Sequence, residues 1–179
     1  MECELCQIRE RDELVLYQDK EVVIALKDTV VTPGQITVYP KEHITILEMV
    51  SDNILMRCSE LANKVSIAAF ESLGSQGTNI VVRNGLGAGQ NVPHFSIEII
   101  PRQENDGLNF QWDAKQISDD EMERVVSLLQ VELKKLDSEI KQDAKKVKKN
   151  EKKDKNEDAV EPDEEEKENY LLRHVRRIP

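Results

Sequence analysis

The stretch that decides the fold is residues 88–102, which read Ala-Gly-Gln-Asn-Val-Pro-His-Phe-Ser-Ile-Glu-Ile-Ile-Pro-Arg. Apolar and polar residues alternate within it, which predicts a strand because successive side chains of a strand point to opposite faces. Three apolar side chains are expected to face the core: Phe95, Ile97 and Ile99. Three polar side chains then share the other face and could carry chemistry: His94, Ser96 and Glu98.

A glycine-rich loop at residues 84–90, Asn-Gly-Leu-Gly-Ala-Gly-Gln, leads into this strand. Glycine permits unusual backbone angles and a close approach, so such a loop can present backbone N–H groups to an anion. The pair Asn84-Gly85 is equally typical of an ordinary turn. The loop alone is a weak indication of an anion-binding site. The row of polar side chains on the strand that follows strengthens this indication.

In the rest of the first hundred residues, short apolar runs of strand length alternate with turn residues. The runs predict strands near residues 14–17, 22–26, 36–39, 80–82 and 95–100. Helical spacing of apolar residues predicts a helix at 52–73, with Ser51 as a cap, and a second helix at about 118–145, with Ser118 and Glu121 in a capping-box pattern. Together these elements predict an α+β fold.

The net charge of −10 is distributed unevenly. Residues 1–112 hold 9 basic and 16 acidic side chains, whereas the shorter remainder holds 16 and 19. Lysines dominate residues 141–155 and acids dominate 156–168, and a segment this poor in apolar residues is expected to be disordered. The sequence predicts four parts, namely a domain at 1–112, a helix at 113–149, a charged linker at 150–167 and a docking tail at 168–179.

Composition also limits the compartment and the partners. No apolar run reaches the ~18 residues of a membrane helix, and the first residues do not resemble a signal peptide. We therefore expect a cytoplasmic protein without a membrane partner. Nucleic acid is not expected as a partner, because the net charge is negative and the acids that follow the lysine block offset it.

Cys3-Glu4-Leu5-Cys6 places two thiols within one turn of the chain. Such a pair supplies half of a tetrahedral zinc site, although a redox pair or two free thiols would have the same spacing. Cys58 falls on the apolar face of the first predicted helix and is expected to be a small core residue. Arg102 is expected to pair with an acid.

Residues 1–103 resemble the histidine-triad family of nucleotide hydrolases and transferases. The family motif is His-φ-His-φ-His-φ-φ, where φ is apolar, usually preceded by Ala-Gly-Gln-x-Val and often followed by Pro-Arg, as at 88–102 here. Upstream matches are Asp28, Pro33-Gly34, Pro40–Ile44, Asn79 and Asn84. The resemblance implies an antiparallel sheet with one main helix, and often a homodimer that extends the sheet. The last nine residues are similar to the tails of archaeal members.

The triad is degenerate, since only its first histidine, His94, is present. Ser96 occupies the position of the family's nucleophile, and Glu98 occupies the third position. A serine hydroxyl is protonated at neutral pH and needs an adjacent base, and the carboxylate of Glu98 repels phosphate. We expect a protein that binds a purine nucleotide, with hydrolase activity lost or much weakened. An enzyme that uses Ser96 with Glu98, a zinc-stapled interaction scaffold and a merely solvated strand face remain alternatives.

The resemblance also implies which residues form the sites. In family members with an N-terminal Cys-x-x-Cys, zinc is held by the equivalents of Cys3, Cys6, His43 and His94. The nucleotide site corresponds to Asp28, Asn84, Gly89, Gln90 and Ser96. Asp28 aligns with an acid that contacts the ribose hydroxyls, although an ordinary turn residue would also fit there.

Overall fold

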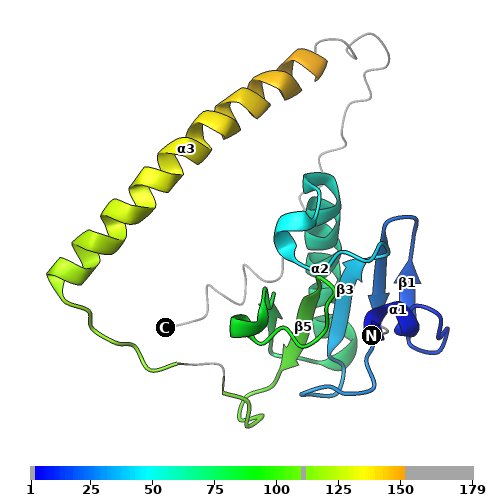
Figure 1. Ribbon diagram of the computed structural model, residues 1–179. Coiled ribbons are helices and arrows are strands. Elements are labelled where there is room, and N and C mark those ends of the chain that lie inside the picture. The colour runs from blue at the N-terminus through cyan, green and yellow to red at the C-terminus, as the bar shows by residue number, and fades with distance from the viewer. Residues whose placement is uncertain (1–2, 110–111, 152–179) are drawn as a thin grey trace, which may run out of the picture. The chain divides into compact units, whose positions relative to one another are not determined.

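The computed structural model describes residues 3–109 and 112–151. The chain divides into two compact units, Met1–Gln111 and Trp112–Pro179. The first unit is built on five antiparallel strands in the order β1-β2-β3-β5-β4 (Figure 1). The strands are β1 (Val15–Gln18), β2 (Val22–Ala25), β3 (Ile36–Pro40), β4 (Gly77–Val81) and β5 (Ile97–Arg102).

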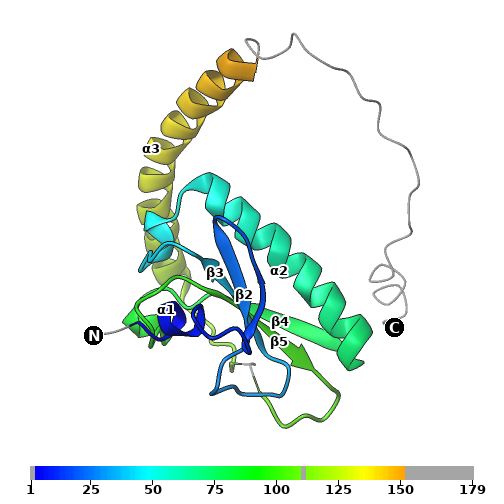
Figure 2. The same ribbon diagram turned by 90° about the vertical axis from the view of Figure 1, so that its right-hand side faces the viewer.

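The two faces of this sheet carry different helices (Figure 2). Val22 and Ile24 of β2 pack in one cluster with Cys58 and Leu61 of α2 (Asp52–Leu73). The intervening β2 residues join a second cluster with Leu5 and Ile8 of α1 (Glu4–Ile8), on the opposite face. Alternate residues of β2 therefore face α2 on one side of the sheet and α1 on the other.

The expected α+β architecture is confirmed, with differences at the element ends. Helix α2 has the predicted bounds and begins at Ser51, but the side chain of this residue makes no capping hydrogen bond. Strand β4 begins three residues earlier than predicted. Strand β5 begins at Ile97 because the chain bends before it, where the His94 N–H donates to Val92 O at 2.8 Å. Phe95, Ile97 and Ile99 face the α2 cluster, as predicted.

Three short elements were not predicted from periodicity, because each is shorter than the window that periodicity needs. Helix α1 spans five residues. The 3-10 turn η2 (Leu86–Ala88) lies inside the glycine-rich loop, between Gly85 with φ +84° and Gly89 with φ +79°. L-residues rarely adopt such backbone angles, which explains the glycines at these two positions. A further 3-10 turn, η1 (Leu47–Met49), precedes α2.

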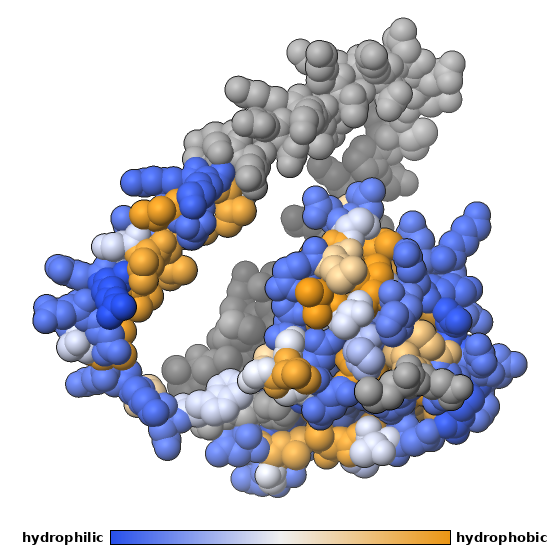
Figure 3. Space-filling model, in the orientation of Figure 1, coloured by the Kyte–Doolittle hydropathy of each residue, from blue (hydrophilic) through white to orange (hydrophobic). Residues whose placement is uncertain are grey.

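The second unit contains α3 (Asp119–Glu151), so the helix predicted at 118–145 is present and extends further. Ser118 Oγ accepts a 3.4 Å hydrogen bond from the Glu121 N–H, which is one half of the predicted capping box. Apolar side chains follow the helix (Figure 3), and they are roughly half exposed: Met122, Val125, Val126, Leu129, Leu133 and Leu136. Most of the predicted linker and the whole predicted tail lie outside the described residues.

Among the described residues, no helix combines the length and the apolar composition that a bilayer crossing requires.

Candidate functional site

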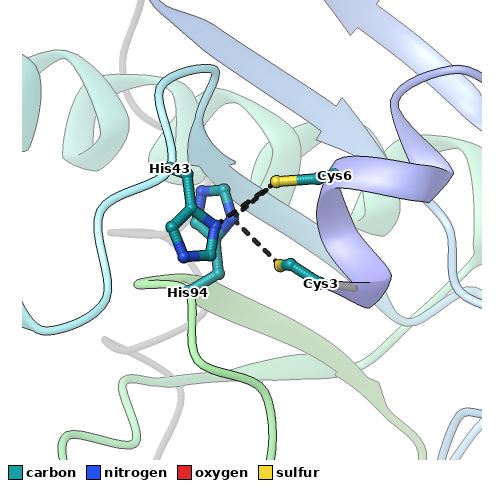
Figure 4. A group of neighbouring side chains, drawn as sticks. All are labelled: Cys3, Cys6, His43 and His94. Atoms are coloured by element: carbon teal, nitrogen blue, oxygen red, sulfur yellow. Dashed lines mark hydrogen bonds between the residues drawn. The ribbon is translucent and has the colours of Figure 1, made fainter. Parts of the chain in front are cut away.

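Four potential metal ligands converge at the N-terminal end of the molecule (Figure 4). Cys3 and Cys6 come from the start of α1 and from within it, His43 from the loop after β3, and His94 from the bend before β5. Their ligand atoms all lie within 4.8 Å of one another. Residues separated by up to 91 positions in the chain thus form one cluster.

Three sulfur–nitrogen distances in this cluster are close to those of a tetrahedral metal site. Cys3 Sγ lies 3.4 Å from His94 Nδ1, and Cys6 Sγ lies 3.4 Å from His43 Nδ1 and 3.6 Å from His94 Nδ1. Zinc bonds of about 2.3 Å to sulfur and about 2.0 Å to nitrogen give sulfur–nitrogen edges of about 3.5 Å in a tetrahedron. The two thiols and two imidazoles therefore fit a Zn²⁺ ion in both chemistry and spacing.

The ring of His94 is oriented for ligation. Its Nε2 lies 2.9 Å from the backbone oxygen of Pro40, which can only accept, so Nε2 carries the proton and Nδ1 has a free lone pair. Burial lowers the pKa of His94, which favours the neutral ring that a metal requires. A backbone carbonyl behind a ligating imidazole is a common second partner at zinc sites.

Helix α1, which contains Cys6 and directly follows Cys3, is anchored to the sheet by polar contacts as well. Tyr39 donates its hydroxyl hydrogen to Leu5 O at 3.0 Å, and Arg9 donates to Lys41 O at 2.7 Å. Burial also raises the pKa of the Cys6 thiol, with Cys3 contributing. The thiol pair is thus held at a defined place, and a bound cation would be needed to favour the thiolates.

A cavity of about 560 Å³ lies beside this cluster, and the two share His94. Its volume is in the range of small-molecule sites. Helix α1 contributes Glu4 and Leu5 to the wall, and the glycine-rich loop contributes Gly89 and Gln90. The other lining residues come from the segment after β2, from the end of β4 and from the β5 region: Lys27, Thr29, Val31, Gln35, Arg83, Asn91, Val92, His94, Ser96 and Glu98.

A network of hydrogen bonds holds Glu98 in the cavity wall. Its Oε2 accepts from Gln35 Nε2 at 2.7 Å and from Thr37 Oγ1 at 3.0 Å, and Lys27 Nζ lies 3.7 Å from Oε1. The Glu98 residue is 5% exposed, so the alternative of a merely solvated strand face does not hold at this position. Desolvation of a carboxylate is costly, and these three partners offset that cost.

A family model described as the HIT domain matches residues 8–105, more than half of the chain. The chain belongs to the HIT family. It is 35% identical over 108 residues to a HIT-like protein of Methanocaldococcus jannaschii, covering 59% of this chain and 82% of that one. It is 30% identical to an adenosine 5′-monophosphoramidase of Schizosaccharomyces pombe, covering 68% of this chain and 91% of the yeast protein.

An adenylylsulfatase of Arabidopsis thaliana is 31% identical over 60% of this chain, which spans 55% of the plant protein's length. Among solved structures, a HIT protein from Bacillus subtilis matches with a TM-score of 0.64 at 27% identity, over 72% of this chain and 95% of that one. A Zn-bound histidine-triad protein from Mycobacterium smegmatis matches with a TM-score of 0.56 at 28% identity, over 77% and 97%.

At the HIT triad positions, the structure distinguishes the three side chains. His94 belongs to the Cys/His cluster, Glu98 is committed to its network, and Ser96 is half-buried and lines the cavity. The acceptor capacity of Glu98 Oε2 is occupied by Gln35 and Thr37. Oε1 of the same carboxylate lies 3.7 Å from Lys27 Nζ, and among the described residues no hydrogen bond joins this carboxylate to Ser96.

The other predicted nucleotide-site residues divide into two groups. Gly89 and Gln90 line the cavity, although the Gln90 side chain also bonds to the Gly85 N–H and to Thr45 O. Asn84 does not line it; instead its amide joins Glu48 Oε1 at 2.7 Å and the Leu47 N–H at 3.0 Å. Asn84 thus ties the glycine-rich loop to η1.

Asp28 also lies outside the lining of this cavity. Its side chain is 59% exposed and forms an ion pair with Arg11, whereas its neighbours Lys27 and Thr29 do line the cavity. Arg102 pairs with Asp106 Oδ2 at 2.6 Å, as the sequence predicted. Cys58 is fully buried in the α2 cluster, and burial raises its pKa to about 12, which is consistent with the predicted core role.

Several residues of the cavity and the network were not singled out from the sequence, among them Lys27, Gln35, Thr37 and Arg83. The sequence could have identified Thr37, because a polar residue between apolar neighbours in a predicted strand indicates a polar contact on the opposite face. Lys27 and Gln35 flank the segment between β2 and β3, and their convergence on Glu98 depends on strand pairing rather than on local pattern.

Proposed function

We propose that this HIT protein binds a purine nucleoside monophosphate in the 560 Å³ cavity and has lost, or retains only weakly, the family's hydrolase activity. The observation that carries the proposal is the pair of side chains at the second and third triad positions. Among the described residues Ser96 forms no hydrogen bond to a base, and Oε2 of Glu98 accepts from Gln35 and Thr37. Loss of a nucleophile in a hydrolase can reduce turnover by about a millionfold.

Nucleotide binding is supported by the family and by the chemistry of the cavity wall. Relatives named as acting on adenosine compounds include the yeast monophosphoramidase and the plant adenylylsulfatase. The wall combines the backbone of Gly89 with cations from Lys27 and Arg83 and with the hydroxyls of Thr29 and Ser96. We retain Asp28 and Asn84 as contacts for a bound nucleotide, to be tested by substitution.

Zinc is proposed as the cofactor, held by Cys3, Cys6, His43 and His94. The donor spacing described above and the Zn-bound mycobacterial relative support this assignment. In this proposal zinc is structural, because all four tetrahedral positions are taken by protein atoms and none remains for a substrate. The first triad histidine then persists as a ligand while the two positions that serve catalysis have diverged.

Calorimetric titration with AMP and GMP tests the binding half of the proposal, and release of AMP from adenosine phosphoramidate tests the catalytic half. We expect binding without turnover. Turnover that disappears in Ser96→Ala would contradict the loss of activity and support an enzyme that uses Ser96. Turnover that persists in that variant would contradict it as well and would point to a different reacting group.

A role as a zinc-stapled interaction scaffold is the second candidate, favoured by the exposed apolar face of α3. Its exposed members include Leu128 at 62%, Leu129 at 56% and Leu133 at 57%. Absence of binding by both nucleotides, together with a normal metal content, would favour this candidate over the first.

We further propose a cytoplasmic homodimer that extends the sheet between subunits. Strand β4 lies at an edge of the sheet and exposes half of the Ile80 side chain. An unpaired edge strand offers free N–H and C=O groups to a second copy. Light scattering on the purified protein should give twice the 20.5 kDa chain mass, and the chain mass alone would contradict the dimer.

A further inference from the structure

The cavity wall contains a charged pair that has no counterpart in a histidine triad. Lys27 and Glu98 both line the cavity, with side chains only 16% and 6% exposed. Lys27 follows β2, Glu98 lies in β5, and β3 runs between these strands. A lysine so shielded from water needs partners for its three ammonium hydrogens.

Glu98 does not provide those partners fully. The 3.7 Å separation between Lys27 Nζ and Glu98 Oε1 permits Coulomb attraction but exceeds hydrogen-bond distance. Oε2 of the same carboxylate already accepts from Gln35 and Thr37. Among the described residues, the structure gives the Lys27 ammonium no hydrogen-bond acceptor. The ammonium is therefore held beside the cavity with donors available to a ligand.

The carboxylate, in contrast, is fixed in place from several directions. The Gln35 side chain is itself fixed, because its Oε1 accepts a 2.9 Å hydrogen bond from the Val31 N–H. The segment after β2 is thus connected to β5 through the hydrogen bond between Gln35 and Glu98. Thr37 faces Glu98 across the β3–β5 pairing. Glu98 thus acts as a rigid anchor that draws the Lys27 ammonium toward the cavity wall.

A second cation lines the same cavity. Arg83 follows β4, and its side chain packs against Gly89, where a Cβ would lie 3.7 Å from Arg83 Cδ. A glycine-rich loop beside an arginine, together with a lysine on the wall, is a common arrangement for a phosphate group.

We propose that Lys27 donates to the phosphate group of the bound ligand, so that the cavity selects a nucleotide over the corresponding nucleoside. This inference rests on the proposed function, because it assigns one group of the ligand to one side chain of the same cavity. Lys27 then supplies a positive charge that offsets the repulsion between the Glu98 carboxylate and the phosphate.

The test compares two variants that both lack the buried carboxylate. Lys27→Met alone would leave Glu98 charged, buried and without its cation, and could unfold the protein. Glu98→Gln and the double variant Lys27→Met/Glu98→Gln both keep an amide oxygen that can accept from Gln35 and Thr37, and they differ only at position 27. Lys64→Met is the matched control, because Lys64 is an exposed lysine on α2.

Titration calorimetry with AMP and with adenosine provides the readout. We expect AMP to bind at least about tenfold more weakly to the double variant than to Glu98→Gln, since a charge-assisted hydrogen bond is lost. Adenosine should bind both variants equally, and Lys64→Met should bind AMP as the unmodified protein does. Equal AMP affinity in Glu98→Gln and the double variant would overturn this inference alone. Failure of both ligands to bind the unmodified protein would overturn the proposed function together with it.

Discussion

His94 Nε2 lies 2.9 Å from the backbone oxygen of Pro40, and this single contact decides which ring nitrogen of His94 faces the cysteines. The opposite nitrogen, Nδ1, lies 3.4 Å from Cys3 Sγ. Pro40 is the last residue of β3, so the sheet itself orients the ring. The ligand geometry is thus built into the pairing of the strands.

Zinc content is the first prediction. The purified protein should contain about one zinc per chain, and Cys3→Ser should lose it, because a tetrahedral site with three protein ligands binds more weakly. With free zinc a hundredfold above its dissociation constant, the protein should have a free energy of unfolding about 3 kcal/mol higher than the metal-free protein has. Atomic emission spectroscopy and urea denaturation provide the two measurements.

Cys58→Ala is the control for that experiment, since Cys58 lies in the α2 cluster. It should change stability modestly and leave the metal content unchanged. A metal-free protein as stable as a zinc-supplemented one would contradict the proposed cofactor.

Truncation of Glu98 is the second prediction. Glu98→Ala removes the acceptor for Gln35 and Thr37 and leaves Lys27 buried without its counter-charge. The expected loss is about 3–5 kcal/mol in the free energy of unfolding, and Glu98→Gln should lose clearly less. Chemical denaturation of the two variants measures the difference. Equal stability of Glu98→Ala and the unmodified protein would show that the network contributes nothing.

Gly34 supplies the third prediction. Its φ is +81°, and a Cβ at this position would lie 2.5 Å from Leu73 Cδ1. Gly34→Ala should therefore lower the free energy of unfolding by about 1–3 kcal/mol. Gly77→Ala is the matched control, because nothing lies within 4 Å of its added Cβ and its φ is ordinary. Thermal unfolding that ranks Gly77→Ala as the more harmful change would contradict the steric argument.

The pH dependence of stability gives the fourth prediction. Hydrogen bonds from the Glu21 and Val22 N–H groups, with Tyr17 and Arg57, lower the pKa of Asp19 to about 2. A carboxyl group whose folded pKa is depressed stabilises the protein above its unfolded pKa of about 3.9, and this stabilisation is lost as pH falls through the folded pKa.

Asp19→Asn keeps an oxygen for the two N–H groups but removes the charge that faces Arg57. At pH 7 we expect the variant to be about 1 kcal/mol less stable, after allowance for solvent screening. The difference should shrink between pH 4 and pH 2. Urea denaturation at pH 7, 4 and 2.5 measures it, and a gap that stays constant across this range would refute the assignment to Asp19.

The sequence predicted those features that depend on local pattern. Alternation at positions 94–99 assigned the faces of β5 correctly, because a strand repeats every two residues whatever its neighbours are. The bounds of α2 followed from its apolar spacing, and in the structure Gly74 ends the helix with φ +62°. The metal ligands were named from the family resemblance, and the structure brings all four together.

Features that depend on distant pairing were not predicted. Glu98 looked like a surface residue because its partners, Gln35 and Thr37, lie more than 60 positions away. Asp28 was assigned to the nucleotide site from alignment alone, and its ion pair with Arg11 depends on how the segment after β2 folds back. Helix α1 was missed because five residues are too few for a periodic signal.

The anchoring of Glu98 has an evolutionary consequence. A histidine introduced at position 98 would remove the carboxylate that receives Gln35 and Thr37, and it would place an imidazole beside the Lys27 ammonium. Because contacting residues do not contribute additively to stability, the cost of this change depends on the side chains at positions 27, 35 and 37. A histidine at position 98 is therefore expected to destabilise the protein less when these neighbours are changed with it.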